Sequence, residues 1–351
     1  MIHLVAPENG AKVSLLTENQ KTFLDISMNQ QISALQTDSE KMLNWLNPER
    51  SESVDCSAAG NVLFMFEVEP ASAENTGTEP VHFLLSEQPN FQDAYIQVTM
   101  ESRLSVNNLK SNTTYYWKVN DSDVYTFTTE DCVPRWIAVD GVSNVRDMGN
   151  WRTINGCKVR QGLIYRGSEL DFHQMITPLG IHTMREKLRI RTDLDLRGEA
   201  VGKVTVSPLG EDIRYLQVPV FAYENFMAQT PEKKETVCRL FEILADECNY
   251  PIYFHCWGGA DRTGTLAFLL NAVLGVPAES LILDYELTTL SFWGPRERGY
   301  KNFQLFLEEL EKYQGTNYNE KAVSYLRNCG VKDTTIETLC RNLLCPEVTT
   351  L

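Results

Sequence analysis

The sequence predicts an α/β domain, with a mostly parallel sheet flanked by helices and a helical C-terminal cap, preceded by an all-β sandwich. Three observations predict this fold class. Apolar and polar residues alternate with a period of two in short runs before residue 134, which is typical of half-buried strands. Short apolar runs alternate with helical patterns after residue 135, which is typical of a parallel sheet covered by helices. One such run, at residues 251–265, passes through a glycine-containing loop directly into a helical pattern.

Residues 1–134 are predicted to be mostly β-structure, with strands at 62–68, 81–85, 95–98, 109–119 and 124–129. The run 109–119 carries Leu109, Thr113 and Tyr115 and resembles the tyrosine-corner strand of fibronectin type III domains. Ser111 stands near a position where that family often has proline. The resemblance implies a fibronectin type III-like β-sandwich, which offers a surface for a protein partner. A polar stretch near residues 28–59 is expected to be an insertion at the surface of this sandwich.

Residues 135–351 follow a junction at residues 132–136 and alternate between strand and helix patterns. Strands are expected near 162–165, 192–196 and 215–218, and directly before Cys256. Helices are expected from Thr177, from Pro231, after the loop, and at 279–290, 298–313, 320–328 and 335–344. Ligands of parallel sheets bind at the carboxyl ends of the strands, which is where Cys256 lies.

Composition excludes several function classes. The net charge is −15; residues 1–134 hold 7 Lys and Arg against 19 Asp and Glu, and residues 135–351 hold 25 against 28. A nucleic-acid partner requires a basic face, so none is expected. No apolar run reaches the ~18–20 residues of a membrane span, and no signal segment opens the chain. We expect a soluble protein, either cytoplasmic or secreted with a leader removed. The nine cysteines and five histidines fit no zinc spacing, so no metal or other cofactor is expected.

The loop after the run at 251–255 has the composition of an anion site. Cys256 ends the apolar run, two glycines follow, and Arg262 stands six residues after the cysteine at the start of a helical pattern. Backbone amides of a tight loop and a helix N-terminus favour anions, and they favour the thiolate form of a cysteine placed there. His255 is positioned to add to this effect. Arg262 supplies a planar fork that matches a phosphoryl group.

The pattern His-Cys-x5-Arg-Thr-Gly at residues 255–264 resembles the active-site loop of the protein tyrosine phosphatase superfamily. Three further blocks, at 144–149, 162–170 and 192–197, occur in the order seen in the bacterial tyrosine/lipid phosphatase branch of that superfamily. The chain departs from the branch pattern at Val145, Met148 and Gly167. The resemblance covers about residues 135–344 and implies a metal-independent hydrolase that forms a cysteinyl-phosphate intermediate.

The resemblance also implies a role for each loop residue. Cys256 is the expected nucleophile, and Thr263 is expected to assist departure of the thiolate or, alternatively, to form hydrogen bonds at the helix N-terminus. The groups expected to bind the phosphate are the guanidinium of Arg262 and the backbone amides of the loop, from Trp257 through Gly258, Gly259 and Ala260 to Arg262. Arg166 is either a second phosphate contact or, as we favour, a buried structural charge. Arg146 and Asp147 are expected to form a paired strut beneath the loop.

The leaving oxygen needs a proton, and the bacterial branch takes it from the aspartate before the loop arginine, here Asp261. The alternative for Asp261 is a helix N-cap, because aspartate is favoured there. Glu224 and Asp195 are the other candidates for the proton donor.

The substrate is expected to be a phosphorylated protein or a small phosphate monoester. No lysine lies between Cys256 and Arg262, and Trp257 either stacks on an aromatic ring or packs at the rim. The sequence thus favours phosphotyrosine-like aryl phosphates, with phosphoinositides or inositol phosphates as the alternative. A phosphate-binding pseudo-enzyme and an adhesion or scaffold protein are the hypotheses from other classes.

Overall fold

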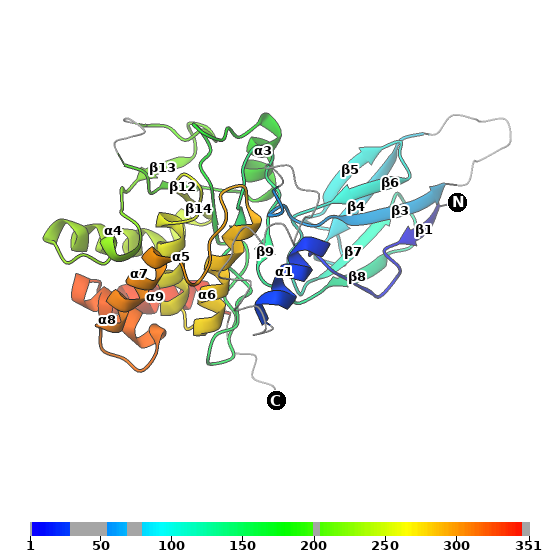
Figure 1. The fold of residues 1–351 in the computed structure, drawn as a ribbon. Helices are drawn as coiled ribbons and strands as arrows, with labels where there is room; N and C mark the ends of the chain where they lie inside the picture. Colours follow the sequence, from blue (N-terminus) through cyan, green and yellow to red (C-terminus); the bar gives the residue numbers. More distant parts are fainter. Residues whose placement is uncertain (1, 29–54, 69–78, 199–203, 346–351) are drawn as a thin grey trace, which may run out of the picture. The chain divides into compact units, whose positions relative to one another are not determined.

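The computed structural model describes residues 2–28, 55–68, 79–198 and 204–345, which form two compact units (Figure 1). Unit 1 comprises Met1–Thr17 and Ala59–Arg135, and unit 2 comprises Glu18–Ala58 and Trp136–Leu351. Among the described residues, no helix combines the length and the apolar character that a membrane span requires.

Unit 1 contains two β-sheets. Strands β1, β3 and β6 form one sheet in that order, and the other has the order β2–β8–β7–β4–β5. The pairing of β2 with β8 is parallel, whereas β1–β3, β3–β6, β4–β5, β4–β7 and β7–β8 are antiparallel. The strands are β1 Ile2–Ala6, β2 Ala11–Val13, β3 Val62–Val68, β4 Val81–Ser86, β5 Tyr95–Thr99, β6 Arg103–Val106, β7 Thr114–Val119 and β8 Tyr125–Thr129.

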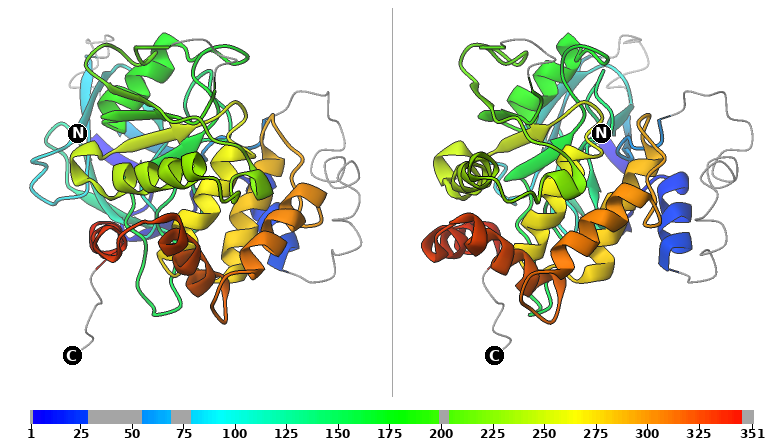
Figure 2. Two further views of the ribbon diagram at one scale, coloured as in Figure 1. Left: turned by 90° about the vertical axis from the view of Figure 1, so that its left-hand side faces the viewer. Right: turned by 60° about the vertical axis from the view of Figure 1, so that its left-hand side comes forward.

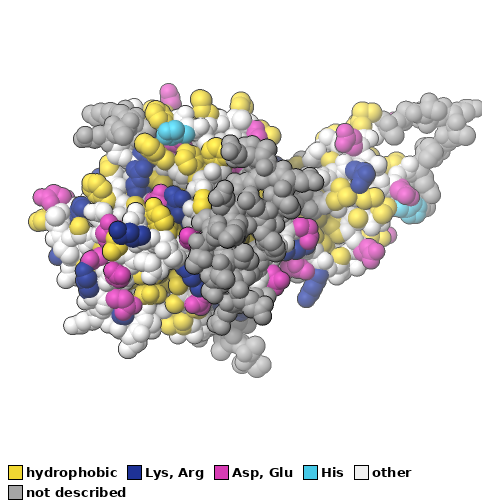
Figure 3. All heavy atoms as spheres, viewed as in Figure 1, with side chains coloured by type: hydrophobic (Ala, Val, Ile, Leu, Met, Phe, Trp, Pro, Cys, Tyr) yellow, Lys and Arg dark blue, Asp and Glu magenta, His cyan; other side chains and the backbone are white. Residues whose placement is uncertain are grey.

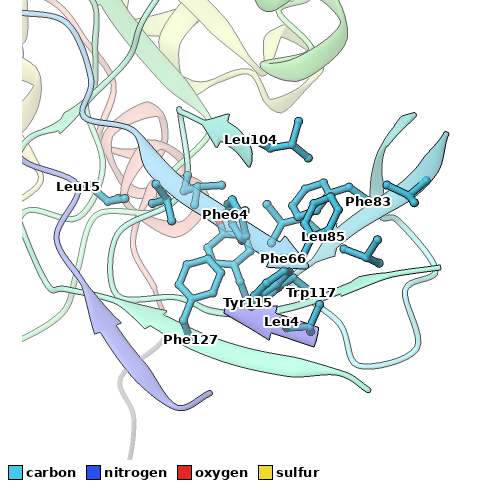
Figure 4. Packing of buried hydrophobic residues seen from close by; sticks show 14 of the residues in the cluster. Leu4, Leu15, Phe64, Phe66, Phe83, Leu85, Leu104, Tyr115, Trp117 and Phe127 are labelled. Atoms are coloured by element: carbon cyan, nitrogen blue, oxygen red, sulfur yellow. The ribbon is translucent and has the colours of Figure 1, made fainter. Parts of the chain in front are cut away.

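One hydrophobic core lies between these two sheets (Figure 4). The ring of Phe64 from the first sheet packs edge-on against Phe83 and Trp117 of the second, with ring centroids 4.8 and 5.2 Å apart. Alternate residues of β3 are buried, so Val62, Phe64 and Phe66 form the core face that its period-two pattern predicts. Four of the predicted strands are confirmed within a residue, whereas the run at 109–119 is a strand only from Thr114. Strands β1, β2 and β6 were not predicted.

The turn before β7 is stabilised by side chains. Tyr115 accepts a hydrogen bond from the backbone amide of Lys110 at 2.8 Å, as in the predicted tyrosine corner. Ser111 donates through its hydroxyl to the carbonyls of Glu130 and Cys132, each at 2.8 Å. A buried hydroxyl thus holds the turn to the end of β8, at the place where proline was expected from the resemblance.

Unit 2 is built on a six-stranded sheet of order β13–β12–β14–β11–β10–β9. The neighbours β13–β12, β12–β14 and β14–β11 are parallel, and β10 runs antiparallel to β11. The strands are β9 Arg135–Trp136, β10 Arg146–Asp147, β11 Ile164–Gly167, β12 Thr192–Asp195, β13 Arg214–Gln217 and β14 Ile252–His255. The mostly parallel sheet is as predicted; β9 and β10 are too short to give a sequence pattern.

Helices cover both faces of this sheet (Figure 2). The α-helices are α1 Glu18–Met28, α3 Pro178–His182, α4 Pro231–Ala245, α5 Arg262–Val273, α6 Ala278–Glu286, α7 Lys301–Glu311, α8 Tyr318–Cys329 and α9 Asp333–Leu343. Shorter helical turns are η2 Thr183–Lys187, η4 Tyr223–Asn225, η5 Glu247–Asn249 and η6 Leu287–Leu290. Tyr165 and Tyr253 belong to the cluster beneath α3 and η2, and α5 contacts β11 and β14. Every helix predicted after residue 135 is present, with ends displaced by a few residues.

The segment Glu18–Ala58 belongs to unit 2, which corrects the prediction that residues 1–134 form a single domain. The side-chain amide of Gln20 in α1 donates to the carbonyls of Cys56 and Ala58, at 3.1 and 2.7 Å. The amide of Cys56 in turn donates to the carbonyl of Leu290 at 2.8 Å. The insertion predicted near residues 28–59 lies mostly outside the described residues, and its described end, at 55–58, contains the Cys56 amide that is bonded to unit 2.

The tyrosine corner gives a first test. Replacing Tyr115 by Phe removes the acceptor of the Lys110 amide, and a lost hydrogen bond of this kind costs ~1 kcal/mol. We expect hydrogen–deuterium exchange of the β7 amides in the full chain to accelerate about fivefold. Tyr116→Phe is the matched control, since its hydroxyl makes no hydrogen bond within the described residues. Equal exchange in both variants would show that the corner does not stabilise unit 1.

Candidate active site

The loop between β14 and α5 is confined by close packing at its two glycines. Cys256 follows β14 directly and is 3% exposed. Gly259 has a φ of +64°, and a Cβ there would collide with the backbone of Gly167. A Cβ on Gly258 would lie 2.8 Å from the ring of Trp293. Both positions therefore require glycine, which explains the composition that the sequence shows.

The carbonyl groups of this loop are held by hydrogen bonds to groups outside it. Four successive carbonyl oxygens have such partners: Cys256 with His255 Nδ1 at 3.1 Å, Trp257 with the Glu169 amide at 2.9 Å, Gly258 with Asn144 Nδ2 at 3.0 Å and Gly259 with Arg166 Nη2 at 2.6 Å. No group of the described residues accepts a hydrogen bond from the amides of residues 257–262. Unused amides at a helix N-terminus form a binding site for an anion.

His255 connects the loop to the neighbouring strand. Its Nε2 lies 3.0 Å from Asp193 Oδ1, and its Nδ1 faces the carbonyl of Cys256. Because both partners accept, both ring nitrogens must donate, which is the protonated form. Burial acts to lower the pKa of His255, but Asp193 outweighs it and the pKa rises to about 9. A positive charge therefore lies beside Cys256, as expected from the sequence.

Two side chains at the start of α5 have no polar partner among the described residues. Arg262 makes no ion pair there, and its guanidinium carbon lies 5.6 Å from the ring centroid of Trp257. The hydroxyl of Thr263 is buried and makes no hydrogen bond within the described part of the chain. The alternative in which Thr263 forms hydrogen bonds at the helix N-terminus is therefore wrong.

A buried ion cluster lies behind the loop. Asp284 of α6 pairs with Arg166 Nη1 at 2.5 Å and with Arg146 Nε at 2.9 Å, and both arginines are fully buried. Burial and the charge of Arg146 lower the pKa of Arg166 to about 10, against the opposing effect of Asp284. Arg146 also donates to the side chain of Asn144, the residue that holds the Gly258 carbonyl. Arg166 is thus a structural charge that holds the loop from behind.

The expected pair of Arg146 and Asp147 does not exist. Arg146 pairs with Asp284 instead, while Asp147 accepts hydrogen bonds from the amides of Gly149 and Gly162 at 2.8 and 2.7 Å. Neighbouring residues of a strand point to opposite faces of the sheet, so they cannot both turn toward the loop. Asp284 was missed because α6 is far along the chain and carries no motif.

Asp261 occupies the N-cap position of α5, but its side chain does not cap the helix. Its side chain forms no capping hydrogen bond; it accepts from Arg296 Nε at 2.8 Å and Nη2 at 2.9 Å, and from the hydroxyl of Tyr223. Burial acts to raise the pKa of Asp261, but hydrogen bonds and charge from Arg296, with Tyr223 and Arg262, outweigh it and hold the pKa below its usual value. Arg296 and Tyr223 were not predicted, since neither belongs to a block that resembles the family.

The other two proton-donor candidates differ in how they are bound. Asp195 is buried and accepts from Arg197 and from the Tyr215 hydroxyl at 2.8 Å. Burial acts to raise its pKa, yet nearby His255 and Arg197 lower it by more. Glu224 in η4 accepts from Asn225 through one oxygen, while its other oxygen is buried without a partner among the described residues. Asp195 is therefore part of a structural ion pair, and Glu224 is the less constrained carboxylate.

Four side chains form an aromatic cluster next to the loop: Phe172, His173, Trp257 and Trp293. The rings of His173 and Trp257 lie 4.8 Å apart, and Phe172 is 63% exposed. Of these four aromatic residues, the sequence indicated only Trp257, because the others lie outside the motif.

Figure 3 shows basic and acidic side chains interspersed over the visible face of unit 2, without a continuous basic patch.

Curated proteins similar to this chain include two phosphatases by name. One is the "Putative tyrosine-protein phosphatase" of Cupriavidus necator, 26% identical over 179 residues, or 42% of this chain and 61% of that protein. The other is "Inositol diphosphatase DSP3" of Arabidopsis thaliana, 27% identical over 103 residues, or 27% of this chain and 51% of that protein. The chain therefore spans less than two thirds of either relative.

Solved structures similar to this chain include the core catalytic domain of the PP-IP phosphatase SIW14 from S. cerevisiae in complex with citrate. It is 15% identical with a TM-score of 0.30, and the match covers 51% of this chain and 86% of that one. A second Siw14 catalytic core is 18% identical with a TM-score of 0.32, covering 47% and 88%.

A family model described as the tyrosine phosphatase family matches residues 137–345, which is more than half of the chain and contains the whole β14–loop–α5 unit with its supporting cluster. The α/β domain is therefore a phosphatase domain, and the chain belongs to the tyrosine phosphatase family.

Proposed function

We propose that this protein hydrolyses phosphate monoesters through a cysteinyl-phosphate intermediate on Cys256, and that tyrosine-like aryl phosphates are its preferred substrates. The observation that supports the chemistry is the orientation of the loop. Its carbonyls are bonded to the scaffold, its amides are unused, and Arg262 has no ion-pair partner among the described residues. Amides and a guanidinium arranged in this way stabilise the equatorial oxygens of a transferring phosphoryl group.

The reaction has two steps. In the first, the Cys256 thiolate attacks phosphorus, the P–O bond to the leaving group breaks, and Asp261 gives its proton to the departing oxygen. In the second, water attacks phosphorus, the P–S bond breaks, and inorganic phosphate leaves. Ionised Asp261 accepts the proton of the water, and the Thr263 hydroxyl donates a hydrogen bond to the departing sulfur. No metal ion is needed, because the loop amides and Arg262 balance the charge.

The aryl preference is supported by the aromatic cluster and by the absence of lysine from the loop. Trp257, His173 and Phe172 offer ring faces on which a phenyl group can stack. Between Cys256 and Arg262 the loop adds no cation that would bind further phosphates. The alternative, an inositol phosphate or phosphoinositide, draws support from the name of the Arabidopsis relative.

Unit 1 is proposed to be a fibronectin type III-like β-sandwich. The proposal is supported by sheets of order β1–β3–β6 and β2–β8–β7–β4–β5 around one core, and by the Tyr115 corner. We propose that its surface binds a protein partner and that unit 2 carries the chemistry. The similarity to the bacterial branch and to the Cupriavidus protein supports a bacterial type of phosphatase.

The nucleophile is tested by Cys256→Ser. A serine alkoxide is hardly populated at neutral pH, so turnover of para-nitrophenyl phosphate should fall by at least ~10³-fold. Circular dichroism should show an unchanged fold. The parent should keep its activity in EDTA and be inhibited by vanadate, which mimics five-coordinate phosphorus. Residual activity within about tenfold of the parent, or rescue of an EDTA-treated enzyme by Mg²⁺ or Zn²⁺, would contradict the proposed chemistry.

The proton donor is tested by leaving-group dependence. Asp261→Asn should lower kcat/KM for phenyl phosphate by about 10²–10⁴-fold, because asparagine cannot protonate the leaving oxygen. The loss should be much smaller for 2,4-dinitrophenyl phosphate, whose leaving group departs unaided. Glu224→Gln and Asp195→Asn are the comparison variants. If Glu224→Gln shows the leaving-group dependence and Asp261→Asn does not, Glu224 is the donor.

Substrate class is tested by Trp257→Ala. Loss of a stacking ring costs ~0.5–1.5 kcal/mol, so kcat/KM for a phosphotyrosine peptide should fall about 2- to 10-fold. Turnover of β-glycerophosphate, which has no ring, should change less. In the parent, kcat/KM for the phosphotyrosine peptide and for β-glycerophosphate is also compared with kcat/KM for a phosphoserine peptide, phosphoinositides and inositol phosphates. A parent that hydrolyses an inositol phosphate at least tenfold faster than the phosphotyrosine peptide would favour the alternative class.

A further inference from the structure

We propose that Arg296 and Tyr223 are positioning residues for Asp261, and that together they set the pH range in which the loop aspartate can protonate the leaving group. The proposal deepens the function proposed above and depends on it. Neither residue lies in the blocks that resemble the family: Tyr223 belongs to η4 and Arg296 to the segment between η6 and α7, and both contact Asp261 at the start of α5.

Arg296 binds Asp261 through a geometry that fixes both groups. Its Nε and Nη2 reach the two carboxylate oxygens at 2.8 and 2.9 Å, which is the bidentate arrangement of a guanidinium with a carboxylate. Its third nitrogen, Nη1, donates to the carbonyl of Pro295 at 2.8 Å, and its backbone amide donates to Thr289 Oγ1 at 3.0 Å. The arginine is therefore anchored in its own segment and is not a freely moving surface side chain.

Tyr223 holds the same carboxylate from another side. Its hydroxyl donates to Asp261 Oδ1 and lies 3.0 Å from the hydroxyl of Tyr285. Its backbone amide donates to Thr265 Oγ1 at 3.0 Å, and this hydroxyl donates to the carbonyl of Asp261 at 2.9 Å. Tyr223 has a φ of +56°, a conformation that a bulky residue adopts only where its surroundings impose it. Its backbone and side chain are thus both tied to the first turn of α5.

The charges around Asp261 determine how its protonation affects the reaction. Arg296 faces it from the segment before α7, Arg262 from α5 and the Tyr223 hydroxyl from η4, with Tyr285 of α6 behind Tyr223. Burial alone would raise the pKa of this carboxyl, but these groups lower it by more. A general acid must carry its proton, so the surroundings confine leaving-group protonation to acidic pH. Removal of Arg296 raises the pKa of Asp261 and extends the protonated form to higher pH.

The test compares two substrates over pH. The ratio of kcat/KM for phenyl phosphate to that for 2,4-dinitrophenyl phosphate, with each value corrected for the ionisation of its own phosphate group, isolates leaving-group protonation, because the thiolate ionisation is common to both. In the parent this ratio should fall with rising pH. Its midpoint should shift upward by about 1–3 pH units in Arg296→Met, the effect of removing a cation next to a carboxylate. The shift should be smaller in Arg296→Lys and Tyr223→Phe.

Arg298→Met is the matched control. Arg298 lies in the same segment and forms a similar ion pair with Glu286, but it does not contact Asp261. In Arg298→Met the kcat/KM ratio should depend on pH as it does in the parent. In Asp261→Asn the ratio should be low and independent of pH, since the titrating donor is gone.

Several outcomes would overturn the proposal. If Arg296→Met lowers both substrates equally and leaves the midpoint unchanged, Arg296 is merely structural. If Arg296→Met does not fold, the same conclusion follows from unshifted midpoints in Arg296→Lys and Tyr223→Phe. If the midpoint also shifts in Arg298→Met, the pKa of Asp261 responds to any loss of positive charge nearby, and no specific role of Arg296 is shown. If the parent does not hydrolyse 2,4-dinitrophenyl phosphate at all, the function proposed for Cys256 is contradicted, and this result is distinguishable from a failure of the proposal on Arg296 and Tyr223.

Discussion

The active-site loop depends on one constraint: its carbonyl groups must point away from Cys256 so that its amides can face an anion. A short loop between a strand and a helix has no internal partners for these carbonyls, so the partners must come from elsewhere. Arg166 and Asn144 supply two of them, and both are held by the buried cluster with Arg146 and Asp284. Breaking a buried cluster of this kind is costly, because it leaves an uncompensated charge, and this cost fixes the loop in one conformation.

Two aspartates near this loop both pair with arginine but differ in exposure. Asp284 is buried between two arginines and pairs with both, so it belongs to the scaffold. Asp261 also pairs with an arginine, but its side chain is 37% exposed at the start of α5, next to the loop. The first carboxylate is inaccessible to a substrate. The second is accessible, and its partners tune it without removing it from reach.

The phosphatase unit also takes structural support from a distant part of the chain. The hydroxyl of Ser57 accepts a hydrogen bond from the amide of Asn144, whose side chain holds the Gly258 carbonyl. Ser57 therefore acts on the loop through a single intervening residue. A chain that starts at residue 135 would lack Ser57 and α1, although both belong to unit 2. The chain passes from unit 1 to unit 2 between Arg135 and Trp136, within the predicted junction, but unit 2 also includes this earlier segment.

Much of the secondary structure and the loop that contains Cys256 could be predicted from the sequence alone. Period-two and helical patterns are local, so they revealed β3, β4, β5, β7 and β8, four strands of the second sheet region and the helices after residue 135, but not β1, β2, β6, β9 or β10. The motif at residues 255–264 drew attention to Cys256 and Arg262. The side chains that hold this loop could be identified only from the folded chain. Asp284, Arg296 and Tyr223 reach the loop from elements separated by tens of residues, and neither periodicity nor spacing reports such contacts. For the same reason the sequence could name Asp261 but could not show that an arginine and a tyrosine hold it.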